Sequence, residues 1–476
     1  MASLLKNTAI YGLGNMAQKG LSFLLVFMFT HYLTPSDIGI INTLQVFSVI
    51  YVFFLSFGLE RSLYRLYHDY KDVQDRRNFL GTINIGIVII STIVISITFL
   101  LKDAISALLP GVAFYPLIIL GMCDAFFTTI TIVPKILFQV EGKPFKFLFL
   151  TLGQAVFGVT CTCVALYMGY RSAAAVFGAG ILSYIFFFPF DLTAIIKNVN
   201  FKFDTKVFTT TLKYSLPMLP SLLSSWVINM SDRFFINHFY NLTQVGLYSV
   251  VYKIGQVVQL FSTAVLMSYN PIFFEMANKP NPDHEKIQKL HNDNILLQLF
   301  MCFIVAFISN DFIKISLTES YLKVAYIVPI VAFGYFFIQM NGLQNLSFHQ
   351  SKKIIALMFI SVFAAVTNII LNYFLIKYYG IDGAAYSTVI TQLIYFAIIY
   401  KISLRYYVLR INFKIIALYY VGMAALVFIF FKYVSPGWLG LTLKLAIIVI
   451  IFYLMFYKQV IGLVTKFKER KQVSAL

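Results

Sequence analysis

The stretch HYLTPSDIG at residues 31–39 is a short polar turn between two long apolar runs, and HFYNLTQVG at residues 238–246 is a second such turn 207 residues later. At this offset Lys6, His31 and Gly39 fall on Lys213, His238 and Gly246. A later offset of 211 residues places Gly169, Ala173, Ala174 and Tyr184 on Gly380, Ala384, Ala385 and Tyr395. The identities are few, but hydropathy and turn positions agree. Such a duplication is typical of membrane transporters built from two halves with the substrate between them.

Apolar runs long enough to cross a membrane recur along the whole chain. Of the 476 residues, 60% are hydrophobic and 12% are charged, which excludes an ordinary soluble protein. Fourteen runs reach the length of about 18 residues that a spanning helix needs. We therefore predict an all-α polytopic membrane protein. The first run is too long for a signal-peptide core and is expected to stay as a membrane anchor.

The distribution of positive charge predicts the orientation of the chain. The formal net charge is +18, and 27 of the 37 Lys and Arg residues fall on the side of the fourteen-span arrangement that holds both termini. Seven fall on the opposite side and three lie inside apolar runs. This asymmetry follows the positive-inside rule and predicts that both termini are cytoplasmic. The charge is therefore explained by topology and lipid contact, not by nucleic-acid binding.

The repeat divides the chain into four parts. We predict an N-terminal six-helix bundle at 1–196, a cytoplasmic interfacial linker at 197–211, a second six-helix bundle at 212–401, and two further helices with a basic tail at 402–476. Six spans are an even number, so both halves enter the membrane in the same direction. The two bundles are thus expected to be parallel and pseudo-symmetric.

Polar side chains inside the apolar runs recur on single helix faces. Residues four apart form a stripe in the seventh run, and shorter stripes occur in the first, fourth and eighth runs. The fourth-run stripe comprises Asp124, Thr128, Thr131 and Lys135. We expect a water-filled cleft between the halves, with hydrogen bonding inside a packed bundle as the alternative. The residues predicted to line the cleft are Asn15, Ser22, Asn229, Asn237, Gln256 and Asn345.

Three cations inside apolar runs are the candidate substrate contacts: Lys19, Arg233 and Lys253. An ionisable group at mid-depth costs at least about 2.5 kcal/mol, so it usually faces a cavity or a partner. None of the three has a cationic counterpart at the matching position of the other half. A cleft with more cations than anions favours an anionic passenger, and the planar fork of an arginine suits a phosphate.

The acids inside the runs are few. Asp124 and Asp232 are candidates for ion coupling. Asp232 points about 100° away from Arg233 on the helix, so it need not neutralise that guanidinium. Asp311 and Glu319 are expected to be solvated charges in the longest external loop, at 310–321.

Three segments in the first 80 residues resemble the polysaccharide-transporter family: KNT at 6–8, YLTPSDIG at 32–39 and FGLER at 57–61. This family contains the Wzx-type O-antigen and capsule repeat-unit flippases. It belongs to the multidrug/oligosaccharidyl-lipid/polysaccharide exporter superfamily, together with MATE exporters and lipid II flippases. The resemblance implies a MATE-like fold and no enzymatic activity.

The same resemblance implies a substrate and a location. The chain would move an undecaprenyl-diphosphate-linked oligosaccharide from the cytoplasmic to the outer leaflet of a bacterial inner membrane by alternating access. Related proteins carry cations in a central cavity, and Lys19, Arg233 and Lys253 fit that role by position. Implied partners are the lipid-linked glycan, membrane lipids, a polysaccharide polymerase and a chain-length regulator.

Two other classes remain open. A drug exporter of the MATE type would prefer acidic and aromatic residues in the cleft, and acids are scarce here. A membrane polymerase would need catalytic groups in a sizeable loop, and the sequence shows no nucleophile–base pair and no metal-ligand cluster. We expect no cofactor. The sequence leaves the energy source open between a proton or sodium gradient, the membrane potential and downstream polymerisation.

Overall fold

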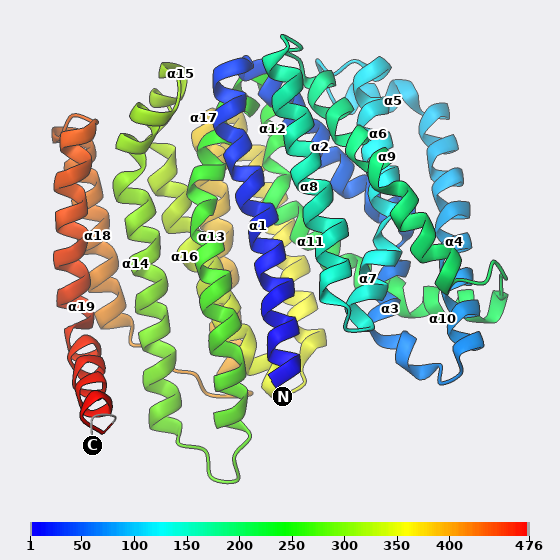
Figure 1. Ribbon diagram of the computed structural model, residues 1–476. Helices are drawn as coiled ribbons and strands as arrows, with labels where there is room; N and C mark the ends of the chain where they lie inside the picture. Colours follow the sequence, from blue (N-terminus) through cyan, green and yellow to red (C-terminus); the bar gives the residue numbers. More distant parts are fainter. Residues whose placement is uncertain (1, 474–476) are drawn as a thin grey trace. The chain divides into compact units, whose positions relative to one another are not determined.

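The computed structural model describes residues 2–473, with side chains described for residues 10–457. Every regular element in this part of the chain is a helix (Figure 1). The N-terminal helices are α1 (Ala2–Tyr32), α2 (Pro35–Ser56), α3 (Leu59–Leu66), α4 (Val73–Leu100), α5 (Lys102–Leu108), α6 (Ile119–Ile130), α7 (Ile132–Val140), α8 (Pro144–Tyr167) and α9 (Ala173–Asn198). The later helices are α10 (Thr205–Ser215), α11 (Leu219–Met230), α12 (Asp232–Phe239), α13 (Leu242–Ala277), α14 (His284–Ser316), α15 (Glu319–Leu322), α16 (Ile327–Gln350), α17 (Ile354–Ser403), α18 (Phe413–Tyr433) and α19 (Trp438–Val473).

Eleven helices in the described part are long and apolar enough to cross a membrane. One of them, α17, has 50 residues and would measure about 75 Å if straight, more than twice the thickness of a hydrocarbon core. Gly380 (φ 59°, ψ −135°) breaks it into two arms, each long enough to span. The α11–α12 pair is interrupted at Ser231, and α1 is a further long helix. These three features account for the difference from the fourteen predicted spans.

The chain forms two compact units. One contains residues 1–253 and 353–398, and the other contains residues 254–352 and 399–476. Helices α13 and α17 therefore contribute residues to both units. The division into halves at 1–196 and 212–401 follows the repeat, whereas these units follow packing, so the predicted domain boundaries stay a prediction.

The duplicated turns meet inside the first unit. A capping box starts α2: the Thr34 hydroxyl accepts from the Asp37 N–H at 3.2 Å, and the Asp37 carboxylate accepts from the Thr34 N–H at 3.3 Å. A Cβ added to Gly39 would lie 1.8 Å from the Leu242 carbonyl oxygen, and one added to Gly246 would lie 1.8 Å from the Pro35 carbonyl oxygen. Pro35 and Leu242 are themselves 207 residues apart. The contact is thus reciprocal, as a pseudo-two-fold relation requires.

The segment predicted as a linker at 197–211 contains more regular structure than expected. It comprises the end of α9, an extended strap at 199–204, and the first turns of α10. Asp204 caps α10 by accepting from the N–H groups of Lys206 (2.8 Å) and Val207 (3.2 Å). Helix α10 packs against α3 and α4 through Val207, Phe208 and Leu212, so it belongs to the first unit.

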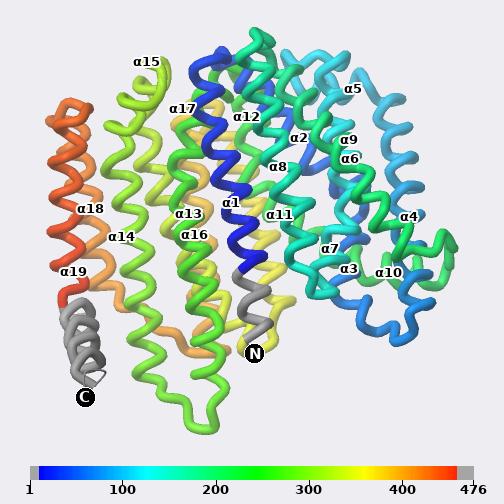
Figure 2. Tube along the Cα trace, viewed as in Figure 1, coloured from blue at the N-terminus to red at the C-terminus, as the bar shows by residue number. Residues whose placement is uncertain are grey.

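In the second unit α14 packs against α16, α18 and α19, and Figure 2 traces the hairpin that joins α13 to α14. The expectation that Asp311 is a solvated loop charge is wrong. Asp311 lies within α14 and is fully buried; its carboxylate receives a hydrogen bond from Lys444 Nζ of α19 at 2.6 Å and another from the Gly437 N–H at 3.0 Å. The loop prediction failed because hydropathy alone does not reveal a charge that is neutralised by a distant residue.

Candidate functional site

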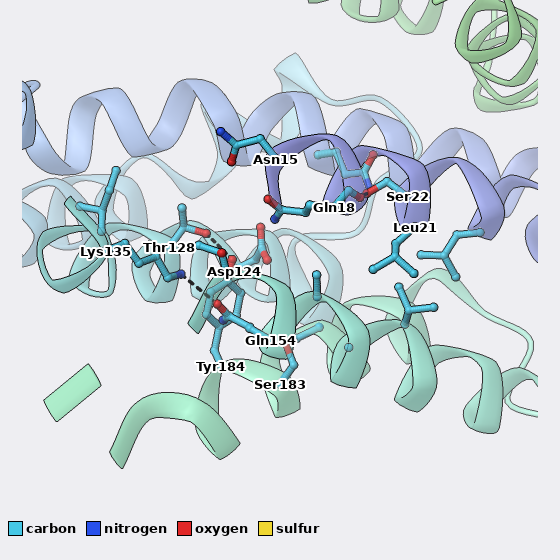
Figure 3. A pocket seen from close by; sticks show the side chains of 18 of the residues that line it. Asn15, Gln18, Leu21, Ser22, Asp124, Thr128, Lys135, Gln154, Ser183 and Tyr184 are labelled. Carbon is cyan, nitrogen blue, oxygen red and sulfur yellow. Dashed lines mark hydrogen bonds between the residues drawn. The ribbon is translucent and has the colours of Figure 1, made fainter. Parts of the chain in front are cut away.

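The helices of the N-terminal half border an open cavity of about 640 Å³ within the first unit, lined by both polar and apolar side chains. Its walls come from α1, α2, α3, α6, α7, α8 and α9. Figure 3 shows Asn15, Gln18 and Ser22 on α1 on one side, with Asp124, Lys135, Gln154 and Tyr184 on the other. Amide side chains are frequent in the lining, and its charged residues are Glu60, Arg61, Asp124 and Lys135. This volume and mixture of polar groups are typical of a pocket for a polar ligand.

Lys135 is the most firmly positioned cation of the cavity. Its Nζ donates to the Gln154 side-chain oxygen at 2.8 Å and to the Thr131 hydroxyl at 3.3 Å, and it lies 5.7 Å from the centre of the Tyr184 ring. Helix α6 ends at Ile130 and α7 begins at Ile132, so Lys135 lies just beyond a break in the span. Both of its hydrogen-bond partners are uncharged. The ammonium is therefore oriented without being neutralised by them.

Asp124 lies in the same wall, on α6. It is partly buried, and Thr128, one turn further on, forms a hydrogen bond of 2.7 Å with the Tyr184 hydroxyl. The fourth-run stripe predicted from the sequence thus faces a cavity, since Asp124, Thr128 and Lys135 all line it. One wall of the cavity therefore carries both a carboxylate, Asp124, and an ammonium, Lys135, about three helical turns apart.

Helix α3 supplies a second charged pair to the cavity. Arg61 lies 3.8 Å from the buried Glu60 carboxylate, and the Arg61 side chain is about half exposed, so it can reach a ligand. Burial raises the pKa of the Glu60 carboxyl, and hydrogen bonding and the Arg61 charge oppose this rise only in part. Tyr64, one turn after Arg61, donates to the Gln139 side-chain oxygen at 2.5 Å and so ties α3 to α7.

Asp191 is an unusual buried acid on α9. Its residue is 1% exposed, and neither carboxylate oxygen has a hydrogen-bond partner among the described residues. Lys135 is a charged group that acts on it. Burying a carboxylate without hydrogen bonds costs free energy. The positive charge of Lys135 offsets part of this cost for Asp191.

A separate buried cluster surrounds Arg233. The guanidinium contacts the Asp232 carboxylate at 2.7 Å and the Asn229 carbonyl oxygen at 2.9 Å, and it lies 4.3 Å from the centre of the Tyr252 ring. Tyr248 donates to the other Asp232 oxygen at 2.6 Å. Asp232 therefore neutralises Arg233, an outcome that the sequence left open. The long arginine side chain folds back to its neighbour, which the 100° offset between backbone positions does not prevent.

A hydrogen-bonded network lies beside this cluster. Ser231 and Asn372 both contact the Asn368 side-chain oxygen, at 3.3 and 3.0 Å, and Asn368 donates to Thr391 at 3.1 Å. Ser387 donates to Asn372. These side chains are buried, and they join α11–α12 to both arms of α17. For Asn368 and Asn372 the structure therefore matches the bundle-packing alternative rather than a wet cleft.

The remaining predicted residues lie in different environments. Asn15 and Ser22 line the cavity, but Lys19 is exposed and is absent from the lining. Asn229 belongs to the Arg233 cluster, and Asn237 donates to the Pro110 carbonyl oxygen at 3.0 Å. Lys253 is half-buried on α13. In the second unit Gln256 donates to Gln259 at 3.2 Å, and the Asn345 side-chain oxygen is buried without a hydrogen-bond partner among the described residues.

The sequence reasoning missed several cavity residues. Lys135 stands in the predicted fourth-run stripe, but it is counted with the cytoplasmic charges and is not among the predicted substrate contacts. Glu60 and Arg61 stand in the FGLER segment but contributed only to the family resemblance. Gln154 gave no signal, because a single amide in an apolar run has no periodicity.

Comparison with known proteins places this arrangement in a family. The model of the family described as "Polysaccharide biosynthesis protein" matches residues 4–277, which is more than half of the chain. The chain belongs to this family. No curated protein matches it in sequence.

Solved structures agree on the fold. The lipid II flippase MurJ in an inward closed conformation has a TM-score of 0.74 at 15% identity, covering 95% of this chain and all of that chain. An inward-facing MATE-family multidrug resistance transporter of the MOP superfamily has a TM-score of 0.56 at 14% identity, covering 88% and 96% of the two chains. The MATE multidrug transporter DinF-BH has a TM-score of 0.57 at 12% identity, covering 85% and 95%. The predicted MATE-like, all-α polytopic fold is confirmed, and the chain is a multi-pass membrane protein.

Proposed function

We propose that this protein is a flippase for undecaprenyl-diphosphate-linked oligosaccharide repeat units of a surface polysaccharide. The observation that carries the proposal is the amide-rich cavity with Arg61 and Lys135 in its wall. Amides and tyrosines provide donors and acceptors for sugar hydroxyls, and the two cations provide charge-assisted hydrogen bonds to phosphate oxygens. The family description and the fold support transport of a lipid-linked substrate.

In this proposal the chain acts by alternating access in the bacterial inner membrane, with both termini in the cytoplasm. The glycan and diphosphate enter the wet cavity, while the polyprenyl chain stays in lipid. Binding favours one conformation only through a difference in affinity between the two states. Lys19 and Lys253 serve as further contacts for the anion along its path, and Arg233 holds the fold around Asp232 as well. Asn15 and Ser22 line this cavity, whereas Asn229 and Asn237 are proposed as further polar contacts in the first unit, and Gln256 and Asn345 in the second.

The driving force in this proposal is a proton or sodium gradient or the membrane potential, with Asp124 and Asp232 as the coupling acids. The protein uses no cofactor and catalyses no bond change. A polysaccharide polymerase and a chain-length regulator act on the product in the outer leaflet.

The test is complementation in the source bacterium after deletion of the gene. The wild-type gene is expected to restore surface polysaccharide, and the Arg61→Ala/Lys135→Ala double variant to lose it while reaching wild-type levels in the membrane. Lipid-linked repeat units should then accumulate in the cytoplasmic leaflet. Lys135→Arg, which keeps the charge, is the matched control. Normal surface polysaccharide in the double variant would overturn the role of this cavity, and a change confined to drug susceptibility would indicate an exporter.

A further inference from the structure

The strap at 199–204 and the start of α10 carry two exposed aromatic rings beside exposed lysines. Phe201 is 66% exposed and Phe203 is 40% exposed, and Lys202 and Lys206 are exposed as well. Exposed phenylalanines are ordinary on a lipid-facing helix, but these lie on a non-helical segment with charged neighbours. Exposed rings beside exposed lysines suggest a surface that contacts another molecule.

The strap is held firmly along α4. The Asn200 N–H donates to the Arg77 carbonyl at 3.1 Å, and the Asn200 side chain donates to Asn78 at 3.1 Å. The Thr82 hydroxyl donates to the Lys202 carbonyl at 3.2 Å and accepts from the Asp204 N–H at 3.1 Å. A Cβ on Gly81 would lie 1.7 Å from the Asn200 carbonyl oxygen, so the bare glycine admits the strap. The rings are therefore presented by a fixed backbone.

The local backbone turns Phe201 outward. The Lys202 N–H donates to the Asn200 carbonyl at 2.7 Å, which makes Phe201 the central residue of a tight three-residue turn. Val199, the residue before this turn, is buried in the core cluster that contains Phe79 and Leu80. Phe203 packs partly against Phe208, at 5.3 Å between ring centres. Phe201 is thus the most outward of these rings.

The depth of the strap is set by the part of α4 that it contacts. That helix begins with a polar turn and the pair Arg76 and Arg77, and its apolar run starts at Phe79. The strap crosses at residues 77–82, which is the boundary between the two. A ring at this level reaches the interfacial region of a bilayer, and a lysine at this level reaches its headgroups.

We propose that the strap and the first turn of α10 form a binding surface for anionic phospholipid headgroups, through Lys202 and Lys206, with Phe201 inserted at the interface. Charge complementarity favours this occupant, because the carboxylate of Asp204, the acid on the strap itself, is engaged at the α10 N-terminus. Each lysine near an anionic surface contributes about a fivefold increase in binding. The surface lies on the segment that links the two repeated halves, and it is independent of the proposed transport substrate.

The experiment uses the full-length protein in vesicles with a tryptophan at position 201. The two native tryptophans, Trp226 and Trp438, are changed to Phe, and Phe201→Trp is added. Fluorescence quenching is compared between brominated phosphatidylglycerol and brominated phosphatidylcholine at equal mole fractions. We expect at least about fivefold enrichment of the anionic lipid around position 201, weakened by high salt and abolished by Lys202→Gln/Lys206→Gln. Circular dichroism and a melting curve check the fold of each variant.

Trp438 provides the matched control. It is 71% exposed at the start of α19, and a Trp226→Phe protein reports on it alone. Its quenching should be the same with both lipids. Equal quenching of the tryptophan at 201 by both lipids would overturn the charge recognition. A complete lack of quenching by either lipid would show that the surface faces water or a protein partner and would overturn the lipid site altogether.

Discussion

Lys135 shows how one side chain can be charged and yet available inside a membrane protein. Its ammonium donates hydrogen bonds to Gln154 and Thr131, which are neutral and leave its field uncancelled, and the Asp191 carboxylate is the charged group that acts on it. In a low-dielectric wall such a field acts strongly on a nearby anion. When a phosphate enters the cavity, the Lys135 ammonium would exchange its neutral hydrogen-bond partners for a charged one.

The first prediction at the residue scale concerns this exchange. Lys135→Met should weaken binding of undecaprenyl diphosphate to the purified protein by roughly ten- to a hundredfold, since a charge-assisted hydrogen bond contributes about 1.5–3 kcal/mol. Titration calorimetry in detergent measures the change. Lys135→Arg should bind within a few-fold of wild type. Unchanged affinity in Lys135→Met would place the diphosphate elsewhere.

The second residue-scale prediction concerns Glu60. Burial raises the pKa of its carboxyl in the folded protein above the ordinary value of about 4.3, so the folded state takes up the proton more readily than the unfolded state. This preferential proton uptake by Glu60 stabilises the folded state at low pH. The contribution is lost as the pH rises through the folded-state pKa of Glu60. Glu60→Gln should remove this part of the pH dependence and should melt at or above the wild-type temperature at pH 8. A steeper loss of stability with rising pH in Glu60→Gln than in wild type would contradict the argument.

At the scale of helices, the crossing of α2 and α13 depends on two glycines. Their Cα atoms lie against the carbonyl oxygens of Leu242 and Pro35, which leaves no room for a methyl group. The two helix N-termini also bring positive dipole ends together, so the contact itself is held by close packing and not by macrodipole attraction. Here the sequence repeat is visible as a physical contact.

Gly39→Ala and Gly246→Ala are therefore expected to lower the melting temperature and to reduce surface polysaccharide. A backbone oxygen cannot move aside as a flexible side chain can, so each methyl group must separate the helices. Gly178→Ala in α9 is the control, because nothing lies within 4 Å of its added Cβ. Gly178→Ala should be neutral or stabilising by up to about 1 kcal/mol from helix propensity alone. Equal behaviour of all three variants in thermal unfolding would refute the close-packing account.

A buried ion pair joins α14 to α19 within the second unit. Asp311 in α14 and Lys444 in α19 are 0% and 2% exposed in their side chains, and Lys444 also lies 5.5 Å from the centre of the Phe307 ring. A buried ion pair contributes little net stability, but removing one partner is costly because the other charge is then buried without compensation. Their pairing explains why an acid and a lysine are retained in apolar segments.

Lys444→Met should cost about 3–5 kcal/mol, because it leaves the Asp311 carboxylate uncompensated. The double variant Asp311→Leu/Lys444→Met should recover most of that loss, since an apolar pair fits the same surroundings. Denaturant unfolding followed by tryptophan fluorescence measures both, and Trp438 in α19 is a suitable local probe. If the double variant were as unstable as the single one, the packing and not the charge would be the important factor.

For the whole molecule, local patterns predicted the membrane helices, which the structure contains. Lengths of apolar runs predicted the membrane helices, and the charge bias predicted their orientation, because each depends only on residues near one another in sequence. The two turns 207 residues apart predicted the duplication, and the reciprocal glycine contact is consistent with it. The FGLER and YLTPSDIG segments indicated the family that the family model then matched.

Only the tertiary structure decided which polar side chains share a cavity. Whether a residue faces a cavity depends on how each helix is rotated and what packs on it, and a shift of one residue turns a side chain by about 100°. Asp124 and Lys135 were on one stripe in the sequence, but Gln154 and Arg61 reach the same cavity from other helices. Arg233 and Asp311 were unpaired charges in the sequence and are neutralised in the fold, by a neighbour and by a residue 133 positions away. The physical reason is that the hydropathy of a helix depends only on the residues of one continuous segment. Charge pairing and cavity lining depend on contacts between segments that are distant in the sequence.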